Sequence, residues 1–249
     1  MEEIFIIDTT LPTAYHRALI SLLYHGDKTD CADWNTKQKE LSMTMVVTDP
    51  LREPMISKCF IGGTVELQQY VMELLDGILD FEIERGNWSY TYHQRYADQY
   101  QFVIDELRRN PSSRRAVMDI RDKLTDMYSN DPACMQHIQF FIRDNKLHMK
   151  VLFRSNDACK ATFMNAFALI MLQKRVADEL GIKVGTYTHR ANSFHCYERD
   201  YDLLNNYVKR IESVLDSEDI TYSYIDDWKE EMDEAIPTIM KKVEELKRE

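Results

Sequence analysis

The chain has 249 residues, of which 44% are hydrophobic, and its formal net charge is −11. This composition excludes an intrinsically disordered chain, and the acidic surface argues against a protein that binds nucleic acid polymers through their phosphates. No stretch approaches the ~20 apolar residues needed to span a bilayer, and the five cysteines lack metal-ligand spacing, so we expect a reduced cytoplasmic protein without a metal site or a membrane partner.

Hydrophobic periodicity predicts the secondary-structure elements in chain order. Alternating or short continuous apolar runs predict strands at residues 4–7, 41–47, 116–120, 138–142, 147–153 and 184–197. Apolar residues at helical spacing predict helices at residues 13–25, 64–84, 98–109, 158–180, 201–214 and 226–249. Asp144 and Asn145 are turn residues that favour a hairpin, and Asp157 is placed to cap the helix that follows it.

The arrangement of these elements favours one folded unit. Strands and helices are mixed without a regular βαβ rhythm, which predicts an α+β fold rather than a doubly wound one. Pro and Gly number only 6 and 7, and no linker-like tract divides the chain. We therefore expect a single domain over residues 1–249, with residues 215–249 as a C-terminal helical extension.

Cys134 is the first candidate functional residue. It follows Asp-Pro-Ala in a predicted loop, just ahead of the strand at residues 138–142. A lone cysteine is often only a small buried hydrophobe. A cysteine presented to a cleft near arginines would instead have a lowered pKa, and its thiolate would be a nucleophile.

Two arginine motifs are candidate phosphate ligands. Arg114-Arg115 precedes one predicted strand, and Arg154-Ser155 follows another. Exposed arginines are commonly solvated surface residues, but guanidinium groups at strand ends also form good phosphate forks. A local arginine cluster can outweigh a distant acidic surface, so a single nucleotide remains a plausible ligand.

Polar side chains in two further elements could read a base and a sugar. Asn165 lies in a strongly apolar helical run, and a buried amide needs a hydrogen-bond partner such as a pyrimidine edge. His195 and Tyr197 share one face of a predicted strand, because side chains repeat every second residue. A surface asparagine and an ordinary sheet would also account for these positions.

The order of these residues resembles the thymidylate synthase family, which includes phage-type nucleotide hydroxymethylases. The resemblance rests on Asn-Pro-Ser-Ser-Arg-Arg at residues 110–115, Cys134, Arg154-Ser155, Asp157, Asn165 and His195-Cys196-Tyr197. It is nearest to the shorter archaeal-type or phage-type members. The resemblance implies a mixed sheet flanked by helices and a sheet-to-sheet homodimer, in which Arg114 and Arg115 reach the neighbouring subunit's nucleotide phosphate.

The resemblance also implies catalytic roles. Cys134 would add to C6 of a pyrimidine nucleoside monophosphate, and Asn165 would hold the base. Glu73 would organise water and relay protons, with Tyr92 in the same water network and Tyr90 as the other candidate. The one-carbon donor would be the co-substrate 5,10-methylenetetrahydrofolate.

The remaining residues of the motif would bind the substrates. In the family, Arg154 and Ser155 correspond to phosphate ligands, and His195 and Tyr197 correspond to ligands of the ribose hydroxyl. Asp157 matches a family aspartate that lies near the folate and the base.

Two reactions and one binding function fit this resemblance. The leading interpretation is a thymidylate synthase that methylates dUMP, because Asn165 favours uracil where phage dCMP hydroxymethylases have Asp. The alternative is a hydroxymethylase of dUMP, dCMP or CMP, favoured by Met135 in place of the usual His and by a charged C-terminal end. A non-catalytic nucleotide-binding dimer is the third possibility.

Overall fold

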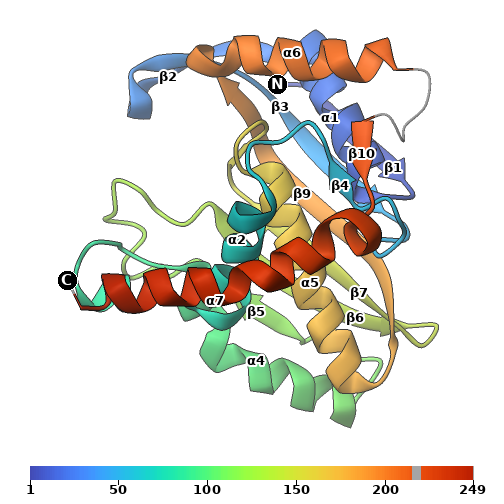
Figure 1. Ribbon diagram of the computed structural model, residues 1–249, viewed down its shortest axis with the longest axis vertical. Helices are drawn as coiled ribbons and strands as arrows, with labels where there is room; N and C mark the ends of the chain where they lie inside the picture. The colour runs from blue at the N-terminus through green and yellow to red at the C-terminus, as the bar shows by residue number, and fades with distance from the viewer. Residues whose placement is uncertain (215–219, 249) are drawn as a thin grey trace.

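The computed structural model describes residues 1–214 and 220–248, and its centre is an eight-stranded mixed sheet (Figure 1). Six strands follow the order β1-β3-β9-β7-β6-β5, with β2 paired to β3 and β8 paired to β9. The bounds are Glu3–Asp8 (β1), Asp27–Cys31 (β2), Thr36–Val47 (β3), Val117–Asp119 (β5), Met135–Arg143 (β6), Lys146–Phe153 (β7), Asn156–Asp157 (β8) and Lys183–Tyr197 (β9). Ile56–Ser57 (β4) and Thr221–Tyr222 (β10) form a separate two-stranded sheet. The mixture of parallel and antiparallel pairs confirms the α+β prediction.

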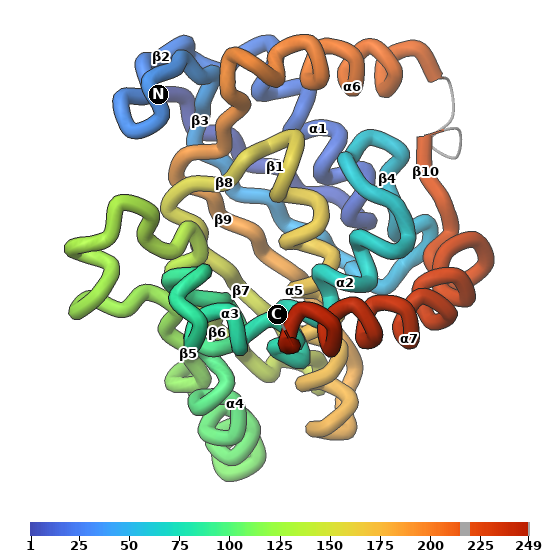
Figure 2. Tube along the Cα trace, turned by 60° about the vertical axis from the view of Figure 1, so that its left-hand side comes forward, coloured from blue at the N-terminus to red at the C-terminus, as the bar shows by residue number. Residues whose placement is uncertain are grey.

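Helices cover one face of this sheet in successive layers. Their bounds are Leu11–His25 (α1), Thr64–Asp76 (α2), Phe81–Glu84 (α3), Tyr92–Arg109 (α4), Thr162–Leu180 (α5), Tyr201–Ser213 (α6) and Lys229–Leu246 (α7). Helix α5 contacts β7 and β9, α2 contacts α5, and α7 contacts the outer side of α2. Figures 1 and 2 both place α7 on the outside of this stack.

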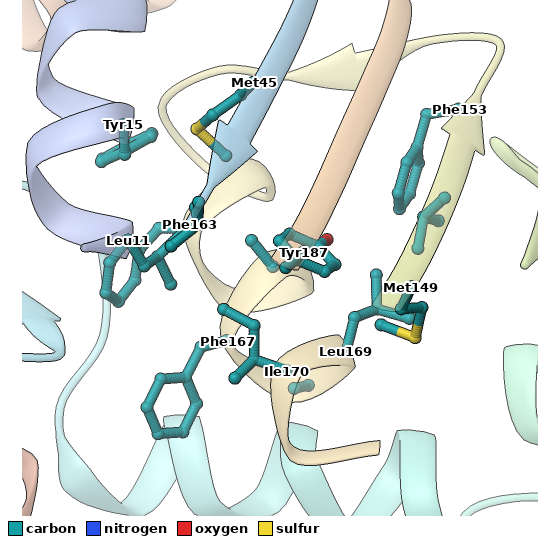
Figure 3. Close-up of a cluster of buried hydrophobic side chains, with 14 of the residues drawn as sticks. Leu11, Tyr15, Met45, Met149, Phe153, Phe163, Phe167, Leu169, Ile170 and Tyr187 are labelled. Atoms are coloured by element: carbon teal, nitrogen blue, oxygen red, sulfur yellow. The ribbon is translucent and has the colours of Figure 1, made fainter. Parts of the chain in front are cut away.

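The hydrophobic core lies between the sheet and α5 (Figure 3). Met149 and Phe153 of β7 and Tyr187 of β9 are buried, because alternate residues of a strand face the same side. On α5, Phe163 packs against Tyr15 of α1 with ring centroids 5.5 Å apart, and Phe167 packs on Tyr224 at 5.4 Å. α5 is apolar on most of its circumference because the sheet and α2 cover opposite sides of it.

At the β1 edge, the other face of the sheet is exposed to solvent. Phe5 and Ile7 are 64% and 53% exposed, whereas Ile6 between them is buried. This alternation separates a core face from an apolar surface at the edge of the sheet.

Two predicted helices have different boundaries from those expected. The helix predicted at residues 64–84 is divided, because Gly77 adopts a left-handed conformation (φ +61°) that ends α2. α4 begins at Tyr92 rather than at residue 98, because the Thr91 side chain accepts a hydrogen bond from the Gln94 backbone N–H at 3.0 Å. The second correction puts Tyr92 in the first turn of a helix instead of a loop.

Boundaries also differ in the second half of the chain and at β2. α5 begins at Thr162 rather than at residue 158, because Asp157 caps the preceding turn through the N–H groups of Cys159 and Lys160. The C-terminal helix begins at Lys229, after a π-helix at Tyr224–Trp228. Periodicity does not predict β2, whose residues are mostly polar and which pairs only with β3. Residues 215–219 and 249 of the expected extension lie outside the described residues.

The predicted hairpin is confirmed. Asp144 and Asn145 join β6 to β7, and both have positive φ angles of 51° and 55°. Such a turn matches the right-handed twist of the flanking strands. The hairpin fixes the register in which the start of β6 lies beside the end of β7, where the candidate site is found.

Candidate active site

A cavity of about 380 Å³ collects most of the predicted site residues at the end of the sheet. It is lined by eight of them: Tyr92, Cys134, Arg154, Ser155, Asp157, Asn165, His195 and Tyr197. Cys134 precedes β6, Arg154 follows β7, and His195 lies near the end of β9. These three strands are neighbours in the sheet, which explains how residues far apart in the sequence line one cavity.

Arg154 holds the loop that carries Cys134. Its Nε donates to the Ala133 carbonyl at 3.1 Å and its Nη2 to the Pro132 carbonyl at 2.7 Å. Its backbone N–H donates to the Cys134 carbonyl at 2.8 Å. The guanidinium therefore lies beside the thiol with two of its nitrogens bound to the protein.

The expectation that Cys134 has a lowered pKa is wrong, although the nearby arginine acts in the expected direction. Burial raises the pKa of the thiol above its ordinary value, and the positive charge of Arg154 offsets this only in part. Desolvation of the thiolate is the larger effect because the cysteine lies among apolar and aromatic groups. Cys134 is consequently a neutral thiol near pH 7.

His195 forms a small polar cluster with Ser155 and Tyr197. Its Nδ1 lies 3.3 Å from the Ser155 hydroxyl, and its ring centroid lies 4.7 Å from that of Tyr197. Burial lowers the pKa of His195, although the Asp157 carboxylate acts in the opposite direction. His195 Nε2 is buried without a partner among the described residues. A neutral imidazole with one unsatisfied nitrogen suits a hydroxyl group of a ligand.

Asn165 is buried in the first turn of α5 and is 5% exposed. Its side-chain oxygen accepts a hydrogen bond from the Tyr70 hydroxyl of α2. The expectation that Asn165 is a buried amide is therefore confirmed, and part of its hydrogen-bonding capacity is met by the protein.

A second cavity of about 410 Å³ adjoins the first, and Tyr70, Tyr92 and Asp131 line both. It contains Glu73 and the aromatic side chains of Trp88 and Tyr90. Its lining residues are Tyr70, Glu73, Leu74, Asn87, Trp88, Ser89, Tyr90, Thr91, Tyr92 and Asp131. Flat aromatic walls beside polar groups fit a large heteroaromatic co-substrate.

Glu73 has the environment of a proton carrier. Burial raises the pKa of its carboxyl group, while a hydrogen bond from Gln69 at 2.8 Å opposes that shift. Glu73 lines the second cavity and not the one that contains Cys134. Tyr92 lies at the junction of the two cavities, and burial raises the pKa of its hydroxyl group.

Tyr90, the other candidate for the role of Tyr92, lines only the second cavity. Burial raises its pKa to about 12, and the Cys134 backbone acts in the opposite direction. Tyr90 and Tyr92 pack with their ring centroids 5.8 Å apart, so both lie close to the cysteine loop.

Arg114 and Arg115 lie apart from both cavities. They are exposed, and they line a third hollow together with Glu106, Arg109 and Ser113. Ser113 donates to Glu106 at 2.6 Å, which fixes the loop before the two arginines. The chain on its own therefore does not bring these arginines to Cys134.

Several lining residues carry no motif that sequence reasoning could recognise. Tyr70, Trp88 and Lys160 belong to this group, together with Trp34, Asp131 and Asn156. Tyr70 alone had a usable signal, because it lies three residues before Glu73 and so shares its helix face. Asn156 belongs to the short strand β8 and Trp34 to a single 3-10 turn, and the others come from loops whose course the sequence does not dictate.

The fold is that of a known enzyme. The solved structure of thermostable thymidylate synthase A from Bacillus subtilis is similar to this chain with a TM-score of 0.62, at 17% sequence identity, over 81% of this chain and 85% of that one. At this identity the similarity establishes the fold.

Sequence comparison establishes the family. The family described as thymidylate synthase matches residues 69–234. A protein of Methanocaldococcus jannaschii, provisionally named thymidylate synthase, is 33% identical over 80% of this chain and 93% of its own length. A protein of Methanosarcina barkeri with the same provisional name is 31% identical over 81% and 93%. The chain belongs to the thymidylate synthase family, whose co-substrate is 5,10-methylenetetrahydrofolate and whose substrate is a pyrimidine nucleotide.

Among residues 1–214 and 220–248, no helix is both long and apolar enough to cross a membrane.

Proposed function

We propose that the protein is a thymidylate synthase that methylates C5 of dUMP. The observation that carries this proposal is the presence of Cys134 and the buried amide of Asn165 in one cavity, within a chain of this family. A thiol supplies the nucleophile, and an amide can hydrogen-bond the edge of a uracil ring.

In the first cavity, Cys134 attacks C6 of the base, and Asn165 stabilises the charge that develops on the ring. Because the thiol is neutral in the free protein, it must lose its proton when substrate binds. The nucleotide phosphate is held by the free part of the Arg154 guanidinium and by Ser155. His195 and Tyr197 bind the sugar hydroxyl, and Asp157, which lines the same cavity, would lie near the folate and the base as the family resemblance implies.

The second cavity would hold methylenetetrahydrofolate, which supplies the one-carbon unit when bound. Trp88 and Tyr90 provide the aromatic surface for its ring system. Glu73, whose pKa burial raises, holds and moves a proton at this junction. Tyr92 connects Glu73 to the cavity of Cys134.

One observation favours a hydroxymethylase as the second candidate. α7 packs on the outer side of α2, and none of its residues lines either cavity. Water can then reach the reacting carbon more easily than in a closed site, and exclusion of water is what protects such a centre from hydration. Met135, which stands where most synthases have His, also favours this second candidate.

We further propose a homodimer in which the uncovered sheet faces meet. Phe5 and Ile7 supply exposed apolar surface on that face. Arg114 and Arg115 would then complete the phosphate site of the neighbouring subunit, since no residue of their own hollow lines the cavity of Cys134.

Product analysis by mass spectrometry tests the proposal. The purified protein is incubated with methylenetetrahydrofolate and, in turn, dUMP, dCMP, UMP and CMP, with Cys134→Ala as the control. We expect dTMP together with dihydrofolate from dUMP. A hydroxymethyl product without dihydrofolate would replace the leading candidate by the second, and absence of any product would favour a nucleotide-binding function.

A further inference from the structure

In the described part of the chain, the side chain of Asn165 forms a hydrogen bond with one other side chain, that of Tyr70. The Tyr70 hydroxyl of α2 donates to the side-chain oxygen of Asn165. Tyr70 lines both cavities, so this contact lies where the cavity of Cys134 meets the cavity of Glu73.

Tyr70 is a permanent donor. Burial raises the pKa of its hydroxyl well above the ordinary value, and the nearby carboxylate of Glu73 acts in the same direction. The phenol is therefore neutral near pH 7. Its hydrogen needs an acceptor, and the Asn165 oxygen is the only one recorded among residues 1–214 and 220–248.

The nitrogen of the Asn165 amide faces the cavity. It donates to none of the described residues. It is also not enclosed by protein, because the buried side-chain atoms without a hydrogen-bond partner belong to Arg95, Gln173, His195 and Tyr201. Because Asn165 lines the cavity, its N–H groups and the second lone pair of its oxygen are presented to a ligand.

Uracil and cytosine present opposite patterns along the edge that such an amide would read. Uracil has a donor at N3 and an acceptor at position 4, whereas cytosine has an acceptor at N3 and a donor at position 4. An asparagine whose side-chain amide can rotate by about 180° matches either base. One that is held in a single orientation matches only one of them.

We propose that Tyr70 is a specificity-determining residue, which holds the Asn165 amide in one orientation so that the site accepts only one of the two bases, which is uracil under the proposed function. If the amide turned over, its NH2 group would face Tyr70, and the phenolic hydrogen would be left buried without an acceptor. Leaving a buried donor unpaired is costly. This inference rests on the proposed function, because it assumes that Asn165 reads a pyrimidine base.

The test measures the dissociation constants of dUMP and dCMP by calorimetry for the wild type and Tyr70→Phe. We expect the wild type to prefer dUMP, and Tyr70→Phe to reduce that preference about tenfold, chiefly because the amide is released. A defect that is merely structural would weaken both nucleotides equally and leave their ratio unchanged.

Tyr96→Phe is the matched control. Tyr96 lies on α4, and its hydroxyl donates at 2.5 Å to the carbonyl of Leu74, which belongs to the same helix α2 as Tyr70. Tyr96 lines neither cavity. This variant loses one buried hydroxyl and should keep the wild-type ratio. If Tyr70→Phe does not fold, Tyr70→Met removes the same hydroxyl and serves for the same measurement.

The outcomes separate the inference from the proposed function. An unchanged ratio in Tyr70→Phe, with dUMP still preferred, would overturn the role of Tyr70 and leave the proposed function intact. A wild type that prefers dCMP would overturn the uracil assignment in both. Binding of neither nucleotide to the wild type would overturn both proposals.

Discussion

The two adjoining cavities share Tyr70, Tyr92 and Asp131, yet they are built in different ways. The cavity of Cys134 is formed by the ends of neighbouring strands and the first turn of α5. The cavity of Glu73 is formed by α2 and the segment of residues 87–92 that leads into α4. The first is part of the sheet framework, and the second depends on how helices and a loop meet.

This difference has a functional consequence. Strand ends hold side chains in a fixed register, which suits groups that must meet one base and one sugar. A cavity between a helix and a loop can change its shape with few residue changes, which suits a larger co-substrate. Variants in each cavity test whether one cavity binds the nucleotide and the other binds the co-substrate.

Glu73→Gln should cause the largest loss of turnover among the variants that keep both the nucleophile and the phosphate ligands. We expect kcat to fall by about 10²–10⁴-fold, because a proton-transfer group is lost. The affinity for dUMP should be nearly unchanged, since Glu73 does not line the cavity of Cys134. Steady-state kinetics and calorimetry measure the two quantities.

Glu66→Gln is the matched control for that variant. Glu66 is an exposed residue at the start of the same helix, where it accepts the Gly63 N–H at 2.8 Å. It should retain wild-type turnover. Loss of dUMP binding in Glu73→Gln would mean that the two cavities do not act separately.

Subunit mixing tests whether Arg114 and Arg115 act across a dimer. The double variant Arg114→Ala/Arg115→Ala and the variant Cys134→Ala should each be inactive alone. Co-expressed in equal amounts, they should recover about a quarter of wild-type activity, because half of the dimers are mixed and each mixed dimer has one complete site. Failure to recover activity, with mixed dimers verified by native mass spectrometry, would mean that these arginines act within their own subunit.

The pH dependence of alkylation reports the state of the Cys134 thiol. In a Cys31→Ser background, iodoacetamide should modify Cys134 with a midpoint above its ordinary pKa near 9, because burial disfavours the thiolate. Arg154→Gln should move the midpoint further upward, since it removes the favourable charge. A midpoint near neutrality would contradict the account of a thiol that is activated only when substrate binds.

The smallest effect concerns acid stability beneath the cavity of Cys134. His189 Nε2 lies 2.9 Å from the side-chain oxygen of Asn156, which lines that cavity, and burial lowers the pKa of His189 to about 3. Below the unfolded-state pKa of about 6.5, the unfolded chain therefore binds a proton that the folded chain does not. Stability is present at neutral pH and is lost as the pH falls.

Between pH 7 and pH 5 this one group should cost about 2 kcal/mol of unfolding free energy. Urea unfolding at the two pH values measures it, and His189→Gln should lose correspondingly less stability on acidification. An equal loss in both proteins would mean that His189 is protonated in the folded state.

The same contrast between cavities explains what could be predicted from the sequence. Strand and helix identities were predictable because periodicity reflects which face is buried, and Cys134, Arg154 and Asn165 lie in short motifs beside those elements. The division of the helix predicted at residues 64–84 could not be predicted, because the left-handed conformation of Gly77 depends on its packing near His93.

The residues that line the second cavity were harder to predict from the sequence. Trp88 lies in a loop between α3 and α4, where its backbone N–H donates to the Glu82 carbonyl at 3.3 Å, and hydrophobic periodicity does not predict the path of such a loop. The pKa of Cys134 was predicted with the wrong sign because sequence proximity reveals a charge but not the extent of burial. Burial is a property of the folded chain, and here it outweighs the nearby guanidinium.

Formation of a covalent complex with 5-fluoro-dUMP and methylenetetrahydrofolate tests the central claim most directly. Intact-mass measurement and peptide mapping should find a single adduct on Cys134, and Cys134→Ser should form none. Absence of an adduct while dUMP still binds, or an adduct on another cysteine, would contradict the assignment of Cys134 as the nucleophile of a pyrimidine-modifying enzyme.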